Sequence, residues 1–140
     1  MPDVRGETVA DQRCFDVSCE PGLVIVRLFG EIDDRQSQMW RDRLTAEIQL
    51  RGAPRFVAFD MIDAHPKNSM KTRFEVAAYC RDLMKRVEWA ALLLPVSVGG
   101  ALVVRIVISI VATSRISVVA SRPELDAVLA SMRRGDRPKG

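Results

Sequence analysis

The sequence predicts an α/β domain whose mixed, mostly parallel sheet has an antiparallel strand at its N-terminal side and four flanking helices. From residue 23 onward, β-branched apolar runs of strand length alternate with segments of helical periodicity, which is typical of parallel strands joined by crossover helices. Before them, the turn motif Glu20-Pro21-Gly22 joins two strand-like runs into a hairpin. The chain has 140 residues, 48% apolar and 28% charged, which suits one domain with an ordinary hydrophobic core.

The first two strands are expected on either side of that turn. Residues 13–18 alternate in polarity, and residues 23–29 form a β-branched run that Gly30 is predicted to end. Asp33 or Asp34 then caps an amphipathic helix. The apolar positions of this helix recur every four residues, at Trp40, Leu44 and Ile48.

A buried strand is expected at residues 55–59, closed by Asp60. A loop, 61–68, follows it, and Ser69 is predicted to cap the next helix. The apolar residues of that helix have helical spacing: Val76, Ala77, Cys80, Leu83, Met84 and Val87. The next strand is expected at residues 89–94.

Residues 99–113 fit two kinds of structure. Their β-branched content favours a strand, whereas their length and their position between two strands favour a crossover helix, which we expect. A short strand is predicted at residues 116–120. In the last helix, Ser121 and Glu124 form a capping box, in which each satisfies the other's backbone N–H. The apolar stripe of this helix consists of Leu125, Val128, Leu129 and Met132.

These elements place the domain at residues 13–132, between a flexible N-terminal segment, 1–12, and a basic flexible tail, 133–140. The N-terminal segment lacks the apolar core of a signal peptide, which predicts a cytoplasmic protein. The apolar run at residues 89–112 is interrupted by a proline and two glycines and contains Arg105. We therefore expect no membrane span.

Cysteine content and charge exclude further classes. An odd number of cysteines without framework spacing (Cys14, Cys19 and Cys80) predicts reduced thiols in a reducing compartment. Cys14 and Cys19 point to opposite faces of a strand, so they are not expected to share a metal. The formal net charge is +3, and the basic residues do not gather in a stripe with aromatic residues, which argues against nucleic-acid binding.

The sequence contains no Gly-rich phosphate loop, no zinc-ligand pair and no nucleophile elbow. Its single histidine, His65, is predicted in a loop near Asp60 and Asp63, where a general base or a metal site is conceivable and a solvated histidine is the simpler interpretation. Gly99-Gly100 is interpreted as a tight turn rather than an anion site. We therefore expect no enzymatic activity, no cofactor and no metal.

Ser69 is the strongest candidate for a regulatory residue. As a helix N-cap its hydroxyl accepts a backbone N–H, which stabilises the fold by about 1 kcal/mol. A phosphate there would meet free backbone amides and the positive end of the helix dipole, and would add almost two negative charges to the surface. Lys67, Lys71 and Arg73 lie close by in sequence, as counter-charges or as solvated residues. Both interpretations of Ser69, a structural helix N-cap and an N-cap regulated by phosphorylation, are compatible with the sequence.

The order of elements and three short motifs resemble the STAS domain, which sulfate transporters and anti-sigma-factor antagonists share. Residues 30–33, Gly-Glu-Ile-Asp, resemble the Gly-Glu-Leu-Asp segment after the second strand of that family. Residues 56–60 resemble its buried third strand, which ends in Asp. The resemblance covers residues 13–132 and is greatest to free-standing bacterial members of the family.

In the antagonists a phosphorylatable serine follows that Asp by nine positions, where this sequence has Ser69. Asn68 stands in place of the family's Asp, and Met70 and Lys71 in place of its Ser-Gly. The resemblance implies a non-enzymatic interaction module, switched by phosphorylation of Ser69, with a kinase-type anti-sigma factor or a signalling complex as its partner. The implied partner surface consists of Asp33, Asp60, Asn68, Ser69, Met70 and Arg73.

Residues 101–112 support an alternative function. As a helix they are apolar nearly all round, and such a helix needs a cover on its outer side. The cover is a second copy of the chain, which predicts a homodimer, or a lipid or other hydrophobic ligand, or a membrane surface; the last helix and the N-terminal segment are the intramolecular alternative. The residues of this surface are Leu102, Val104, Ile108 and Val111.

Overall fold

Five strands form one mixed sheet in the computed structural model, which describes residues 13–138. The strands are β1 (Phe15–Glu20), β2 (Leu23–Ile32), β3 (Phe56–Pro66), β4 (Trp89–Leu93) and β5 (Ile116–Val119). The helices are α2 (Asp34–Arg51), α3 (Met70–Met84), α4 (Val98–Val111) and α5 (Arg122–Arg133). The elements follow one another in the predicted order.

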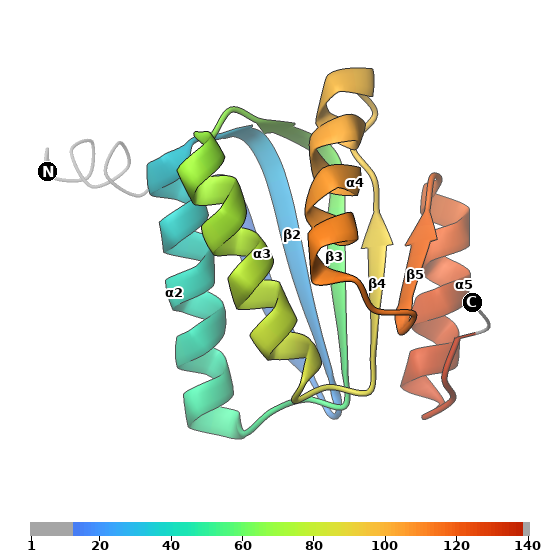
Figure 1. Cartoon of the computed structure of the whole chain (residues 1–140). Coiled ribbons are helices and arrows are strands. Elements are labelled where there is room, and N and C mark those ends of the chain that lie inside the picture. Colours follow the sequence, from blue (N-terminus) through green and yellow to red (C-terminus); the bar gives the residue numbers. More distant parts are fainter. Residues whose placement is uncertain (1–12, 139–140) are drawn as a thin grey trace, which may run out of the picture.

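The strand order in the sheet is the order in the chain, β1-β2-β3-β4-β5. β1 is antiparallel to β2, and the other neighbouring pairs are parallel. α2, α3 and α4 cover one face of the sheet, and α5 covers the other (Figure 1). The predicted fold class, a mostly parallel sheet with an antiparallel N-terminal strand and four helices, is confirmed.

The predicted helix caps are present. Asp33 Oδ1 accepts the Gln36 N–H at 2.8 Å and begins α2, and Ser69 Oγ accepts the Thr72 N–H at 3.2 Å and begins α3. At α5 the capping box is formed in part. Ser121 Oγ accepts the Glu124 N–H as predicted, but the Glu124 carboxylate accepts the Ser121 hydroxyl instead of its backbone N–H.

Two strands are longer than predicted. β2 continues past Gly30, which has a φ of +71°, and the pairing register shifts between Arg27 and Phe29. β3 continues to Pro66, so residues 61–66 are strand and not loop. Polar side chains at Asp63 and His65 face solvent while the alanine between them is buried, an alternation typical of a strand. The extension carries β3 to the start of α3.

Residues 99–113 are helical, as expected, but the helix has distinct sides. Val104 and Val111 are buried against the sheet, whereas Leu102 is 59% exposed. The predicted single surface of four residues is therefore wrong, because only Leu102 of the four points outward. α5 cannot provide the intramolecular cover, since it lies on the opposite face of the sheet.

The two glycines at the start of α4 form part of its first turn and not a separate tight turn. A Cβ atom at Gly100 would lie 2.7 Å from Ser97 Oγ and 3.0 Å from Pro95 Cβ. It would also lie 3.2 Å from Pro66 Cδ, at the end of β3. Gly100 thus allows α4 to begin close against the sheet edge.

Residues 133, 135 and 137 contact the rest of the domain, whereas a flexible tail was predicted at 133–140. Arg133 forms two hydrogen bonds with the Glu20 carboxylate, at 2.8 and 2.9 Å. Arg55 donates to the Gly135 carbonyl, and Arg137 pairs with Glu88. The predicted flexible segment 1–12 and residues 139–140 lie outside the described residues. Within residues 13–138, every helix is too short or too polar to cross a bilayer.

Candidate functional site

Ser69 lies on the surface where β3 ends and α3 begins. Its hydroxyl is exposed, and Oγ lies 3.2 Å from the Thr72 backbone N and 3.3 Å from Thr72 Oγ1. Its backbone N–H donates to Asp34 Oδ1 at 2.7 Å, which links the start of α3 to the start of α2. The extended conformation of Ser69, with φ −71° and ψ 163°, is the one a helix N-cap adopts.

Asp34 is a site residue that the sequence analysis missed. The Ser69 backbone hydrogen bond, followed by hydrogen bonds to the Ser69 and Thr72 side chains, lowers the pKa of the Asp34 carboxyl. A phosphate on Ser69 would stand next to this carboxylate, and two neighbouring negative groups repel each other. The only sequence indication of this contact is the acidic pair at the start of the first helix, of which Asp33 serves as the cap.

Three of the other predicted residues form a cluster beside Ser69. Arg73 Nε donates to Asn68 Oδ1 at 3.1 Å, and Arg73 Nη1 lies 3.5 Å from the sulfur of Met70. Arg73 forms no ion pair with any residue in the range 13–138. We call Asp34, Asn68, Ser69, Met70 and Arg73 the Ser69 site.

Asp60 is not part of the Ser69 site, in contrast to the prediction. It is buried in β3, and its carboxylate pairs with Arg122 of α5, with 2.7 Å between Oδ2 and Nη1. Asp63 instead pairs with Arg27 at 3.8 Å, and His65 lies on the exposed side of β3. Among residues 13–138 no group of histidine, cysteine or acidic side chains is arranged to hold a metal.

Exposed apolar side chains lie next to the Ser69 site. α3 and α4 run side by side in the same direction, so both begin at the same edge of the sheet (Figure 1). On α3, Met70 is 55% and Phe74 56% exposed; on α4, Val98 is 85% and Leu102 59% exposed. With Ile106 of α4, which is 44% exposed, these residues are called the α3–α4 apolar surface. Of its five members, Met70 and Leu102 were predicted as site residues.

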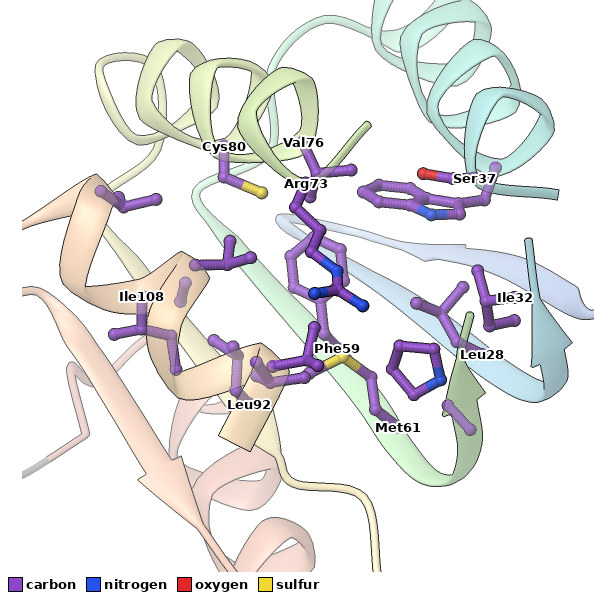
Figure 2. A pocket seen from close by; sticks show the side chains of 18 of the residues that line it. Leu28, Ile32, Ser37, Phe59, Met61, Arg73, Val76, Cys80, Leu92 and Ile108 are labelled. Carbon is purple, nitrogen blue, oxygen red and sulfur yellow. The ribbon is translucent and has the colours of Figure 1, made fainter. Parts of the chain in front are cut away.

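A cavity of about 100 Å³ lies behind these residues, between the helices and the sheet (Figure 2). Most of its lining is aliphatic or aromatic, from β2, β3, β4 and the three helices of this face. The polar lining groups include Ser37 of α2 and Asn68 and Arg73 of the Ser69 site. Cys80 of α3 also lines it, and burial raises the pKa of the Cys80 thiol to about 12, so the group is not a reactive thiolate at neutral pH.

Two solved structures resemble this arrangement. One is the Bacillus cell fate determinant SpoIIAA in its phosphorylated form, with a TM-score of 0.56 and 20% sequence identity over 81% of this chain and 98% of that chain. The other is the anti-sigma factor antagonist SpoIIAA in its unphosphorylated form, with a TM-score of 0.58 and 18% identity over 83% of this chain and 96% of that chain. The chain has the STAS fold. Neither the family models nor the curated proteins include a match.

On this STAS fold, the Ser69 site occupies the edge where the parallel strands end, which is where open α/β sheets place their functional residues. The arrangement offers one exposed hydroxyl at the N-terminus of a 15-residue helix. A phosphate on that hydroxyl would be attracted by the positive end of the helix dipole and repelled by the Asp34 carboxylate. The arrangement thus suits a change of surface charge beside exposed apolar side chains.

Proposed function

We propose that this chain is a non-enzymatic regulatory module that acts in the cytoplasm by binding another protein through the Ser69 site and the α3–α4 apolar surface. The observation that carries the proposal is the exposed Ser69 hydroxyl next to exposed apolar side chains at one edge of a STAS fold. The solved neighbours include an anti-sigma factor antagonist, which suggests a kinase-type anti-sigma factor as the class of partner. The free thiols of Cys14, Cys19 and Cys80 agree with a reducing compartment.

Phosphorylation of Ser69 is the proposed switch. The structurally similar SpoIIAA has been solved in phosphorylated and unphosphorylated forms, which supports phosphorylation as the proposed modification. Here a phosphate on Ser69 would bring almost two negative charges to within hydrogen-bonding range of Asp34, whose carboxylate already accepts the Ser69 N–H. The repulsion would loosen the contact between α2 and α3 and change the charge that a docked partner meets.

Apolar contact supplies the proposed affinity. Met70 and Phe74 are more than half exposed, although large apolar side chains at protein surfaces are usually covered when they cluster. Aromatic and methionine side chains are enriched at the centres of protein interfaces. Phe74 therefore serves as the proposed anchor of the partner, and Ser69, one turn away, as the group that controls it.

The test compares Ser69→Asp with Ser121→Asp, since Ser121 caps α5 in the same way on the opposite face of the sheet. Each variant and the wild type are used to capture proteins from native cell extract, with quantitative mass spectrometry as the readout. We expect one or more proteins to be lost at least tenfold with Ser69→Asp and retained with Ser121→Asp. Identical capture profiles for the two variants contradict the proposal, and phosphate mapping after incubation with ATP tests the switch directly.

Self-association through the outer side of α4 is a second candidate function, supported by the exposed row Val98, Leu102 and Ile106. These residues are spaced at intervals of four, so they form one stripe along the helix. Leu102→Glu is expected to convert a dimer into a monomer in sedimentation experiments, whereas Leu50→Glu, at an exposed leucine of α2, serves as the matched control. A wild-type protein that is monomeric at all concentrations contradicts this candidate.

A further inference from the structure

The cavity beneath α3 and α4 has its polar groups at one end. Ser37 lies one turn into α2, and Asn68 and Arg73 lie at the start of α3, all near the sheet edge that holds Ser69. Further along α3 and α4, the lining consists of apolar groups and the Cys80 thiol, as at Ile108 (Figure 2). A cavity with one polar end and one apolar end matches a ligand with a polar head and an apolar tail.

Ser37 is a buried hydroxyl without a partner. Its residue is 0% exposed, and Oγ is the one buried side-chain oxygen or nitrogen among residues 13–138 that has no hydrogen bond. A helical serine can donate to the carbonyl four residues earlier, and here the Asp33 carbonyl accepts the Ser37 N–H at 2.9 Å but receives no hydrogen bond from the Ser37 hydroxyl. In Figure 2 the Ser37 oxygen points away from α2 in the direction of Val76 of α3. An unsatisfied buried hydroxyl in a cavity wall points to a ligand atom that would satisfy it.

Arg73 supplies a positive charge at the same end. Its contacts are with the neutral Asn68 amide and the Met70 sulfur, and within residues 13–138 no carboxylate neutralises it. A guanidinium group matches a carboxylate in two parallel hydrogen bonds, and this pairing is stronger next to an apolar cavity than in water. The head group that fits Arg73 is therefore an anion with two oxygens.

We propose that this cavity binds a small aliphatic monocarboxylate. Its alkyl chain fills the space beside Cys80 and Ile108, Arg73 pairs with the carboxylate, and the Ser37 hydroxyl donates to one carboxylate oxygen. Size limits the chain, because a dry cavity of about 150 Å³ holds one benzene molecule. The cavity of about 100 Å³ therefore suits about four to six carbons rather than a full-length fatty acid. This site shares Asn68 and Arg73 with the Ser69 site, but hexanoate binding does not require the proposed partner.

Hexanoate is the probe, and hexanol and dodecanoate are the comparison ligands. Titration calorimetry with the full chain is expected to give a Kd of about 1 mM for hexanoate, as burial of about five methylene groups implies. Hexanol, which lacks the charge, is expected to bind about tenfold more weakly, and dodecanoate to bind no more tightly than hexanoate. In ¹H–¹⁵N spectra, hexanoate is expected to shift the Cys80 and Ile108 resonances.

Substitutions test which residues bind the carboxylate and which bind the alkyl chain of the ligand. Arg73→Gln is expected to weaken hexanoate binding about tenfold and to leave hexanol binding unchanged. Arg81→Gln, an exposed position on the same helix, is the matched control and is expected to change neither. Val107→Phe fills the cavity and is expected to abolish binding of both ligands. Ser37→Ala is expected to weaken hexanoate binding about threefold while the free protein unfolds at an equal or higher temperature.

Three results would overturn the assignment. Equal affinity for hexanoate and hexanol in the wild-type protein removes the carboxylate from the proposal without the use of any variant. Absence of shifts at Cys80 and Ile108 with saturating hexanoate removes the cavity. Equal loss of hexanoate binding in Arg73→Gln and Arg81→Gln removes the specific role of Arg73. Phe74→Ala, which removes the proposed partner anchor outside the cavity lining, is expected to retain hexanoate binding, so failure of this site and failure of the partner surface are separate outcomes.

Discussion

The two faces of the sheet differ in how completely they are closed. On the α5 face, apolar side chains from β3, β4 and β5 pack against one helix, and Phe56, Leu93 and Leu125 are at most 1% exposed. Ion pairs secure both ends of that helix, between Arg122 and Asp60 and between Arg133 and Glu20. The face of α2, α3 and α4 contains the cavity, the unpartnered Ser37 hydroxyl and the α3–α4 apolar surface.

This difference separates stability from function within one small fold. Close packing and satisfied polar groups on the α5 face leave little for a partner to bind. Incomplete packing and exposed apolar residues on the other face lower stability and are the usual properties of binding surfaces. Substitutions of the same chemical type on the two faces are therefore expected to have different consequences.

Truncation of the α5 core is expected to have the largest effect. Leu125→Ala removes a side chain that is 1% exposed and is expected to lower the free energy of unfolding by about 2–5 kcal/mol. Leu102→Ala, the same change on the exposed side of α4, is expected to alter it by less than about 0.5 kcal/mol. Urea denaturation followed by circular dichroism measures both. Equal losses would contradict the distinction between the faces.

Loss of the Asp60 charge is expected to have the next largest effect. Asp60→Asn leaves the Arg122 guanidinium without its carboxylate, which is 6% exposed, and is expected to lower the free energy of unfolding by about 1–3 kcal/mol. Asp63→Asn is the matched control, because the Arg27–Asp63 pair is exposed and is expected to contribute less than about 1 kcal/mol. A smaller loss for Asp60→Asn than for Asp63→Asn would contradict a structural role for Asp60.

Local chemistry in the sequence was sufficient to predict most of the fold. Capping residues and apolar periodicity located all four helices, because these features act within a few residues of each other. The ends of β2 and β3 were missed, since strand length depends on a neighbour that is distant in sequence. Ile32 at the end of β2 pairs with Pro66 at the end of the neighbouring strand β3. Each strand is therefore lengthened by its pairing with the other, which the sequence of either segment alone does not indicate.

The site was predictable only where it consists of neighbours in the sequence. Asn68, Ser69, Met70 and Arg73 lie within six consecutive positions and were identified together. Asp34 was missed because its contact with Ser69 spans 35 positions in the chain, and Asp60 was misassigned because its partner, Arg122, is 62 positions away. The cavity has no sequence signature, since it results from how three helices fail to fill the space above the sheet.

The two serine caps test whether the faces differ in function at positions where the same substitution is expected to cost the same stability. Ser69→Ala and Ser121→Ala each remove one hydroxyl that accepts a backbone N–H, and each is expected to lower the free energy of unfolding by about 1 kcal/mol. Thermal unfolding measures this similarity. Incubation with ATP and native extract is then expected to label the wild type and Ser121→Ala but not Ser69→Ala. Labelling of Ser69→Ala at the wild-type level would place the modification elsewhere.

The smallest expected effect is a pH-dependent one at the rim of the closed face. Hydrogen bonds from Arg133, the largest cause, lower the pKa of the Glu20 carboxyl in the folded protein. The Glu20 carboxyl therefore stays protonated to a higher pH in the unfolded chain than in the folded one. The Glu20–Arg133 pair stabilises the fold above the unfolded pKa of about 4.3, and this contribution disappears as the pH falls through the lower pKa of the folded protein. The Glu20 side chain is 34% exposed, so the contribution is expected to stay below about 1 kcal/mol.

Urea denaturation from pH 3 to pH 7 is therefore expected to show wild type more stable than Glu20→Gln at neutral pH and equal to it in acid. Glu31→Gln, which removes an exposed pair with Lys67 near the open face, is the control for the change in net charge, and a wild-type advantage that persists at pH 3 would contradict the assignment of this contribution to Glu20.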